Sequence, residues 1–312
     1  MNRLVDDLQA RHLAFEKEQV HLLTVLYGIV TGRSDSPAHL AVAKCLELMK
    51  SSTLILDDFL DKSTERHGTR SLFAELGPEE AVLTAELLKS SASIALALAL
   101  DGVPNVSSAT RQNCLMLFED TYRTVCLGQL EDMRLAKHML IDWRPSEQDY
   151  WSMIHKTTAV FIQLPLLIGS ALMGLEQGVT GALYDYGLNL GLAYQVRDDV
   201  LDVLGDGSAS GKPRGGDIRE KKARLPLIRG LAAATADQAQ DIRGALAQAV
   251  PSTQDIERVL EILLATKAVD SCAGDIVRLT GDAVHAVQGM VDSDMAHQLS
   301  DAASILIPPM NL

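Results

Sequence analysis

Two aspartate clusters with identical spacing lie in apolar, helix-patterned segments, at residues 57–61 and 198–202. On an α-helix, residues i and i+4 share a face, so each cluster presents a pair of carboxylates. Like charges at this spacing repel each other and weaken a helix, so we expect a cation to compensate them. Oxygen ligands that leave room for water and phosphate suit Mg²⁺. The spacing therefore predicts two facing helices that bridge a diphosphate through Mg²⁺.

The bulk composition limits the classes of protein to consider. Length alone, 312 residues, suggests about two domains. No Pro-, Gly- or Ser-rich linker divides the chain, so we predict a single domain over residues 1–312. The net charge of −13 argues against nucleic acid as a partner.

Cysteine spacing and apolar length indicate the compartment. The four cysteines show no pairing or ligand spacing and the first residues show no signal peptide, which predicts buried thiols in a reducing cytoplasm. The longest apolar stretch, residues 159–175, is about 17 residues long and contains Gln163 and Pro165. A membrane-spanning helix needs roughly 20 residues. We therefore predict a buried core helix and no transmembrane segment.

Hydrophobic periodicity predicts an all-α protein. Apolar residues recur at helical spacing almost everywhere, and no convincing period-two run is found. Glycine and proline pairs such as Gly77-Pro78 separate segments of about 15 to 30 residues, longer than an average helix. Few segments are polar along a whole side, so several helices must be buried nearly all round. The pattern predicts a large helical bundle.

Further motifs flank the clusters in a fixed order. They are Gly128-Gln129, Lys156-Thr157, Tyr194-Gln195 just before Asp198, and a closing element with Gly211-Lys212, Asp217 and Lys222 through Pro226. With both clusters, these motifs make the chain resemble the trans-isoprenyl diphosphate synthases, the polyprenyl synthetase family, over roughly residues 15 to 230. The resemblance implies the isoprenoid synthase fold, a helical bundle around a central cavity shared with class I terpene synthases.

The resemblance also implies roles for individual residues. Three Mg²⁺ ions would grip the diphosphate of an allylic substrate, because metal ions and basic side chains neutralise the leaving group without moving a proton. The metal ligands would be Asp57, Asp61, Asp198 and Asp202, with Asp58 and Asp199 as supporting carboxylates. Diphosphate oxygens would be contacted by Arg66, Lys156, Lys212 and Lys222, with Gln129 and Gln195 nearby.

The second diphosphate site of the family, for isopentenyl diphosphate, matches poorly. The Gly-Lys-Arg-x-Arg-Pro motif of that family falls on residues 16–21, where Lys17 remains but Glu18 and Val20 replace the arginines. Lys50 stands where the family has a histidine, and His67 replaces an arginine. Neither Glu nor Val supplies the bidentate fork of arginine. We therefore expect this site to be dismantled or remodelled.

This asymmetry leads to the functional expectation of a class I terpene synthase that ionises an allylic diphosphate and cyclises the cation. Ser52 and Thr53, just before the first cluster, are small. The resemblance places the floor of the substrate pocket at these positions, so we expect a long substrate of C15 to C25. The aromatic content of 4% counts against cyclisation, because aromatic rings stabilise carbocations.

Two alternatives stay open. One is a chain-elongating prenyltransferase, whose unusual isopentenyl diphosphate site would use Lys17, Lys50, Arg66 and His67. The other is a silent partner subunit of an active synthase, which has no reason to keep six repelling aspartates. A homodimer is implied by the resemblance alone.

Overall fold

The computed structural model describes residues 22–33, 35–66, 69–138, 146–205 and 214–310, and its elements are almost all helices. They are α2 (Leu22–Thr31), α3 (Pro37–Asp61), α4 (Leu72–Leu76), α5 (Pro78–Gly102), α6 (Ser108–His138), α7 (Glu147–Ile154), the π-helical turn η1 (His155–Ala159), α8 (Val160–Met173), α9 (Gln177–Leu204), α10 (Gly216–Arg219), α11 (Leu225–Ala233), α12 (Ala236–Ala247), α13 (Thr253–Ala265), α14 (Ala268–Val287) and α15 (Ser293–Leu306). A two-residue antiparallel pair, β1 (Glu65–Arg66) and β2 (Thr69–Arg70), interrupts them. The predicted all-α class is confirmed.

The chain divides into two compact units, which we describe separately. Unit 1 comprises residues 1–123, 161–187 and 286–302, and unit 2 comprises residues 124–160, 188–285 and 303–312. The boundaries fall inside helices of the chain and not in loops. The single domain over 1–312 stays a prediction.

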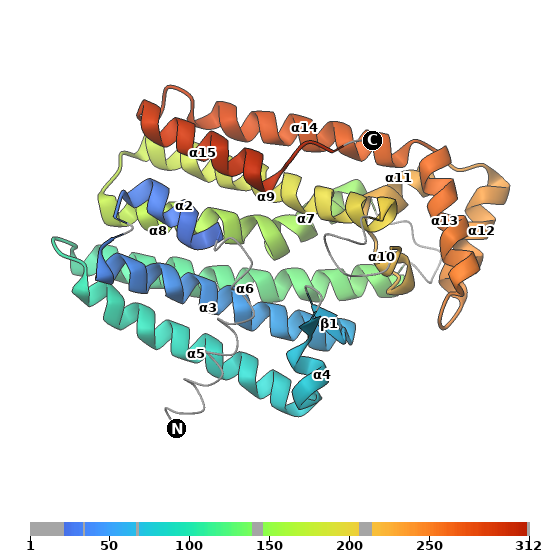
Figure 1. Cartoon of the computed structure of the whole chain (residues 1–312), viewed down its shortest axis with the longest axis horizontal. Helices are drawn as coiled ribbons and strands as arrows, with labels where there is room; N and C mark the ends of the chain where they lie inside the picture. Colours follow the sequence, from blue (N-terminus) through green and yellow to red (C-terminus); the bar gives the residue numbers. More distant parts are fainter. Residues whose placement is uncertain (1–21, 34, 67–68, 139–145, 206–213, 311–312) are drawn as a thin grey trace. The chain divides into compact units, whose positions relative to one another are not determined.

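Unit 1 is organised around α3 and α5, which lie side by side (Figure 1). Each begins with a proline in its first turn, where the missing N–H costs no hydrogen bond. Their buried faces join a cluster that includes Tyr27, Met49, Phe118 and Leu164. This packing fixes the direction in which α3 delivers the first aspartate cluster.

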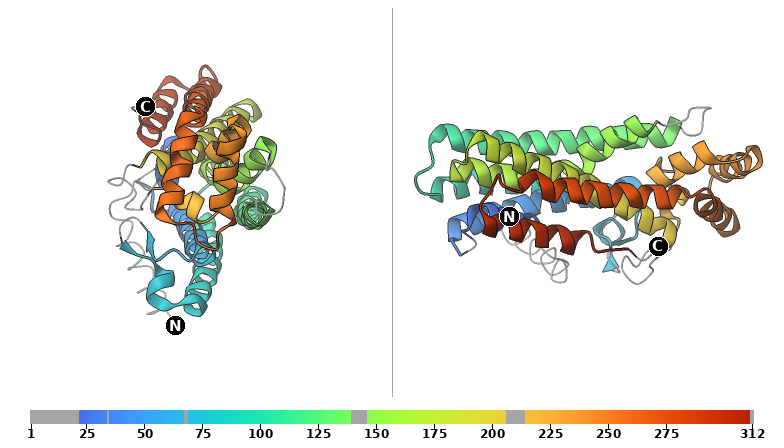
Figure 2. Two further views of the ribbon diagram at one scale, coloured as in Figure 1. Left: turned by 90° about the vertical axis from the view of Figure 1, so that its right-hand side faces the viewer. Right: turned by 90° about the horizontal axis from the view of Figure 1, so that it is seen from above.

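Unit 2 contains α7, η1, the C-terminal halves of α6 and α9, and the helices from α10 to α13. Helices α12 and α13 pack against each other, as the views of Figure 2 also show. Both begin with capping boxes, in which Thr235 and Ser252 accept hydrogen bonds from the first turn. A buried row on α13, including Ile256, Leu260 and Leu263, supports α10 and α11.

Two segments have the length and hydropathy to cross a membrane: α5, and the run α7–η1–α8 (Glu147–Met173). In the second, 56% of the most apolar window is buried inside the protein, and α8 carries the predicted core stretch with Pro165 inside it. In α5 only 33% is buried. The absence of a transmembrane segment stays a prediction.

Candidate active site

The first aspartate cluster occupies the last turn of α3. The helix ends at Asp61, because Lys62 takes a left-handed conformation and its N–H bonds back to the Phe59 carbonyl. Asp57 and Asp61 are therefore one helical turn apart, as the spacing predicts. Asp57 and Asp61 are both half-buried, and Asp58 is 3% exposed.

Arg66, on β1, ties this cluster together. Its Nη2 donates to Asp57 Oδ2 at 2.7 Å and its Nε donates to Asp58 Oδ1 at 2.9 Å. The two carboxylates raise the pKa of the guanidinium, against the effect of its burial. In this structure Arg66 therefore bonds two carboxylates of the first cluster, Asp57 and Asp58.

Three more predicted residues of unit 1 lie on α3. Ser52 is fully buried and its hydroxyl donates to the Met49 carbonyl at 2.7 Å. Thr53 is 7% exposed and its hydroxyl donates in the same way to the carbonyl of Lys50, which is half-buried. These small side chains satisfy their polar groups within their own helix. Their role as the floor of a pocket stays a prediction.

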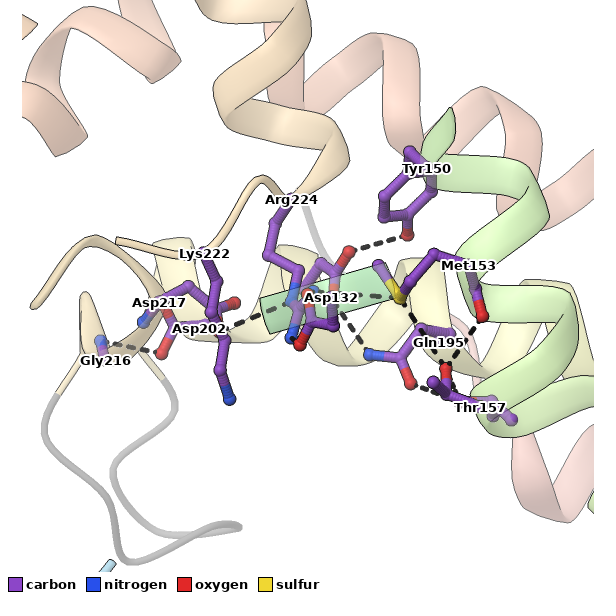
Figure 3. A network of polar contacts seen from close by, with 12 residues as sticks. Asp132, Tyr150, Met153, Thr157, Gln195, Asp202, Gly216, Asp217, Lys222 and Arg224 are labelled. Atoms are coloured by element: carbon purple, nitrogen blue, oxygen red, sulfur yellow. Dashed lines mark hydrogen bonds and ion pairs between the residues drawn. The ribbon is translucent and has the colours of Figure 1, made fainter. Parts of the chain in front are cut away.

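The second cluster lies near the end of α9, in unit 2 (Figure 3). Asp199 is 2% exposed and both its oxygens are engaged by protein donors. Tyr150 donates to Oδ2 at 2.6 Å, and the Gln195 amide donates to Oδ1 at 2.9 Å. The Thr158 hydroxyl in turn donates to the Gln195 carbonyl at 2.6 Å. Asp199 is thus held as a supporting carboxylate, while the neighbouring Asp198 is exposed.

Asp202 accepts hydrogen bonds from the backbone at the start of α10. The N–H of Gly216 donates to Oδ1 at 2.9 Å and that of Asp217 donates to Oδ2 at 3.2 Å. The N–H of Gly215 also bonds the Asp202 carbonyl at 2.9 Å. These bonds hold the segment after residue 213 against the second cluster, so that Asp217 joins it.

The carboxylates of this cluster carry more negative charge than the protein compensates. Burial raises the pKa of Asp199 to about 8 and that of Asp202 to about 7, and repulsion from Asp217 adds to both. Burial also raises the pKa of Asp217. Carboxyl groups with raised pKa values are stabilised in their charged form by a nearby cation, so this cluster is suited to bind one.

The Lys156-Thr157 element lies in the π-helical turn η1, a form that occurs often at functional sites. Lys156 forms an ion pair with Glu131 on α6 and donates a second hydrogen bond to the Ser152 hydroxyl at 3.0 Å. A Cβ on Gly128 would lie 2.8 Å from the Cβ of Lys156, so only glycine allows α6 to approach so closely. Gln129 follows it, half-buried. The Gly-Gln and Lys-Thr elements are thus packed together.

Two cations stand beside the second cluster. Lys222, whose side chain is 13% exposed, pairs with Glu220 at 2.9 Å. Arg224 binds Asp132 through both terminal nitrogens, at 2.7 and 3.0 Å. A small pocket in unit 2 is lined by Asp202, Asp217, Lys222 and Arg224, among others. The geometry suits an anion that arrives with its own metal ions.

Several of these residues were not among the site residues predicted from sequence: Asp132, Tyr150, Thr158, Asp217 and Arg224. Asp217 and Arg224 stand inside the closing motif of residues 211–226, so they could have been included. Tyr150 and Thr158 carry no spacing signal, because their contacts depend on tertiary packing. Lys17, His67 and Lys212 lie outside the described residues.

Within the described residues, no three His, Cys, Asp or Glu side chains converge to hold a metal by themselves. Magnesium commonly takes one or two carboxylates and completes its shell with water and substrate phosphate. The donors are all carboxylate oxygens, and those of the second cluster are undercompensated. The residues present therefore fit Mg²⁺ bound together with a phosphate ligand.

Comparisons with known proteins agree with this chemistry. The family model described as "Polyprenyl synthetase" matches residues 17–263. The short chain isoprenyl diphosphate synthase of Methanocaldococcus jannaschii is 28% identical over 81% of this chain and 75% of its own length. The geranylgeranyl diphosphate synthase of Saccharolobus solfataricus is 29% identical over 71% of this chain, which spans 64% of that relative.

A solved structure gives the same result. The geranylgeranyl pyrophosphate synthase of Corynebacterium glutamicum, complexed with isoprenyl diphosphate and magnesium, superimposes with a TM-score of 0.78. The match covers 97% of this chain and 90% of that one, at 26% identity. The predicted isoprenoid synthase fold is confirmed.

These relatives overturn the expectation of a terpene synthase. Their names describe enzymes that make isoprenyl diphosphates, which is the elongating alternative. The error came from treating the missing arginines at Glu18 and Val20 as the loss of a whole site. Phosphate accepts hydrogen bonds from lysine, histidine and backbone donors as well, so one altered motif does not remove a diphosphate site.

Proposed function

Because the chain belongs to the polyprenyl synthetase family, we propose that it is a Mg²⁺-dependent prenyltransferase that elongates an allylic diphosphate with isopentenyl diphosphate. The observation that carries the proposal is the second cluster. There Asp202 and Asp217 line a pocket together with Lys222 and Arg224. The raised pKa of Asp202 indicates that the negative charge of these carboxylates is not fully balanced. A diphosphate with its metal ions supplies the charges that this site lacks.

The proposed first step is ionisation of the allylic substrate. Asp57 and Asp61 in unit 1, and Asp198 and Asp202 in unit 2, are the proposed metal ligands. When bound, Mg²⁺ would neutralise the charge that develops on the leaving diphosphate. Lys156 and Lys222 would stabilise the same negative charge electrostatically, without transferring a proton. The carbon–oxygen bond breaks and its electron pair leaves with the diphosphate. The number of ions, three in the resemblance, stays a prediction.

The second step joins the two substrates. The double bond of isopentenyl diphosphate attacks the allylic cation and forms a new carbon–carbon bond. A proton then leaves the adjacent carbon for an oxygen of the released diphosphate, and a new double bond forms. We propose that the described Lys50 and Arg66, with Lys17 and His67, supply the cations for the second substrate. Against the effect of burial, the carboxylates of Asp57 and Asp58 raise the pKa of Arg66, so it stays charged throughout.

The proposed allylic substrate is long, C15 to C25. Ser52 and Thr53, on α3 just before the first cluster, have small side chains, and both are buried. A bulkier residue there would shorten the chain that the enzyme can hold.

The protein is also proposed to act as a homodimer in the cytoplasm. Exposed leucine and isoleucine side chains follow one face of α5, at Leu83, Leu87, Ile94 and Leu98. Their spacing of 4, 7 and 4 residues keeps them on one stripe of the helix. A second copy with the same stripe could cover it, since a two-fold interface is self-complementary.

The cysteines support the proposed location in the cytoplasm. Cys45, Cys114 and Cys272 are buried free thiols, which suits a reducing compartment.

The test incubates the purified protein and Mg²⁺ with farnesyl or geranylgeranyl diphosphate, with and without isopentenyl diphosphate. We expect diphosphates longer by C5 units, seen by mass spectrometry, when isopentenyl diphosphate is present. Asp202→Asn should lower the rate by about 10²-fold or more, since the removed charge serves the ionisation step. The matched variant Asp149→Asn, at the cap of α7, should retain it. A hydrocarbon or alcohol from the allylic substrate alone would contradict the proposal.

A further inference from the structure

The guanidinium of Arg224 lies among three carboxylates from three different helices (Figure 3). Its two terminal nitrogens bind Asp132 of α6, at 2.7 and 3.0 Å. Its Nε lies 3.8 Å from Asp199 of α9 and 3.6 Å from Asp217 of α10. The Arg224 side chain is 11% exposed, so this is an interior arrangement.

The backbone fixes Arg224 in this place. It is the residue that precedes α11, in an extended conformation, and Leu225 and Pro226 after it are buried. A bidentate pair with Asp132 fixes the plane of the guanidinium. With the plane fixed, the remaining nitrogen, Nε, points towards Asp199 and Asp217.

Charge explains why a cation is needed here. Buried carboxylates are stable only when they are paired or bound to a metal. Arginine stays charged in proteins, and the surrounding carboxylates raise its pKa further, against the effect of its burial. One fixed positive charge thus serves three carboxylates that would otherwise repel each other.

We propose that Arg224 is a built-in cation that occupies the place of a divalent ion behind the second aspartate cluster. Asp132, Asp199 and Asp217 then serve to anchor Arg224 and hold the cluster in shape, while Asp198 and Asp202 are the proposed ligands of Mg²⁺. Arg224 is in this sense a positioning residue. The assignment of Asp198 and Asp202 to Mg²⁺ rests on the proposed function, and the role of Arg224 does not.

The proposal makes a prediction about metal binding without substrate. Asp132, Asp199 and Asp217 form no metal site while Arg224 is present. Replacing Arg224 by a small neutral residue leaves a space between them, and their oxygens are then the only ligands that can turn towards an ion in it. Such a donor set binds Mg²⁺ or Mn²⁺. We therefore expect Arg224→Thr to gain one Mn²⁺ site that the unaltered protein lacks, although the protein has lost a positive charge and a buried ion pair.

The experiment titrates Mn²⁺ into substrate-free protein, with calorimetry for stoichiometry and thermal unfolding for stability. Without metal, Arg224→Thr should unfold about 5 °C or more below the unaltered protein, because an uncompensated buried charge is costly. Millimolar Mn²⁺ should restore at least half of this loss, and calorimetry should show one additional ion per chain. Arg224→Lys, which keeps the charge, should gain no site.

Two further variants separate this effect from general destabilisation. Arg229→Thr removes an arginine of α11 that pairs with Glu147 of α7 and Asp275 of α14, and not with the second cluster. It should lose stability without recovery by Mn²⁺. The double variant Asp132→Asn with Arg224→Thr should lose the gained site.

The proposal is overturned if Arg224→Thr binds no more Mn²⁺ than the unaltered protein, or if Mn²⁺ restores none of its stability. An Arg224→Thr protein that fails to fold even in millimolar Mn²⁺ would count equally against it. Failure of the proposed function would show in a different measurement, the product assay on the unaltered protein, and would leave the Mn²⁺ titration unaffected.

Discussion

The Thr158 hydroxyl donates to the side-chain carbonyl of Gln195 at 2.6 Å. This bond fixes the orientation of the amide, so that its nitrogen donates to Asp199 at 2.9 Å. The π-helical turn that carries Thr158 thereby reaches the second aspartate cluster through one side chain. Two hydrogen bonds therefore link the turn η1 to the second aspartate cluster on α9.

Thr158→Val tests this link. Without the hydroxyl, the Gln195 amide can turn over and its bond to Asp199 weakens. We expect a loss of about 1 kcal/mol in unfolding free energy and a fall in kcat of up to about tenfold. Urea unfolding and steady-state kinetics measure the two effects. Thr280→Val removes a similar hydroxyl, bonded only to its own helix, and should change neither quantity much. Equal effects in the two variants would refute the link.

Close packing at η1 gives a second prediction. A Cβ on Gly191 of α9 would lie 2.4 Å from the Cα of Ala159, which is backbone and cannot move aside. Gly191→Ala should therefore lower the unfolding free energy by about 1–3 kcal/mol. Gly274→Ala, in α14 with no atom within 4 Å, should instead raise it by about 0.5–1 kcal/mol. Urea unfolding of both variants checks the opposite signs.

A buried histidine predicts a pH effect on stability. His39 is 6% exposed and its Nδ1 lies 2.7 Å from the Tyr27 hydroxyl. Burial, with a contribution from Arg33, lowers the pKa of His39. The unfolded chain then takes up the proton more readily, so this contribution to stability is present above about pH 6.5 and is lost as pH falls below it. His39→Gln should abolish this loss. Unfolding free energies from pH 7.5 to 5.5 measure it, and parallel curves for the two proteins would contradict it.

Much of the fold followed from the sequence, and part of the site did not. Helical periodicity predicted a large helical bundle, because apolar residues recur at helical spacing along segments as long as α3, α5 and α9. The spacing of Asp57 and Asp61 predicted their common face. The position of Arg224 could not be predicted, since its carboxylate partners come from helices 92, 25 and 7 residues away in the chain. Contacts of this kind depend on how helices pack, which no local pattern records.

The size of the substrate pocket gives a fourth prediction. Ser52→Phe places a large ring on the buried face of α3, just before the first cluster. We expect the product distribution to shift to chains shorter by at least one C5 unit, because the growing chain meets the ring. Mass spectrometry of the products measures it. Leu48→Phe, a half-buried position one turn earlier, is the control for added bulk in the same helix. An unchanged distribution with Ser52→Phe would show that this face does not line the pocket.

The exposed stripe on α5 gives a fifth prediction. Leu83→Glu with Leu98→Glu places charges in the proposed dimer interface, where burial without a partner is costly. We expect a dimer for the unaltered protein and a monomer for the double variant, by light scattering on a sizing column. Val277→Glu, at an equally exposed valine on α14, should leave the dimer intact. A monomeric unaltered protein would refute the interface.

The most direct test of the central claim counts diphosphate. Each elongation step breaks one allylic carbon–oxygen bond, so it releases one diphosphate for each isopentenyl diphosphate consumed. With farnesyl diphosphate, Mg²⁺ and isotopically labelled isopentenyl diphosphate, we predict one diphosphate released per labelled C5 unit found in the product. We predict almost no release when isopentenyl diphosphate is left out. Sustained release from farnesyl diphosphate alone, with unlabelled hydrocarbon or alcohol as product, would contradict the account.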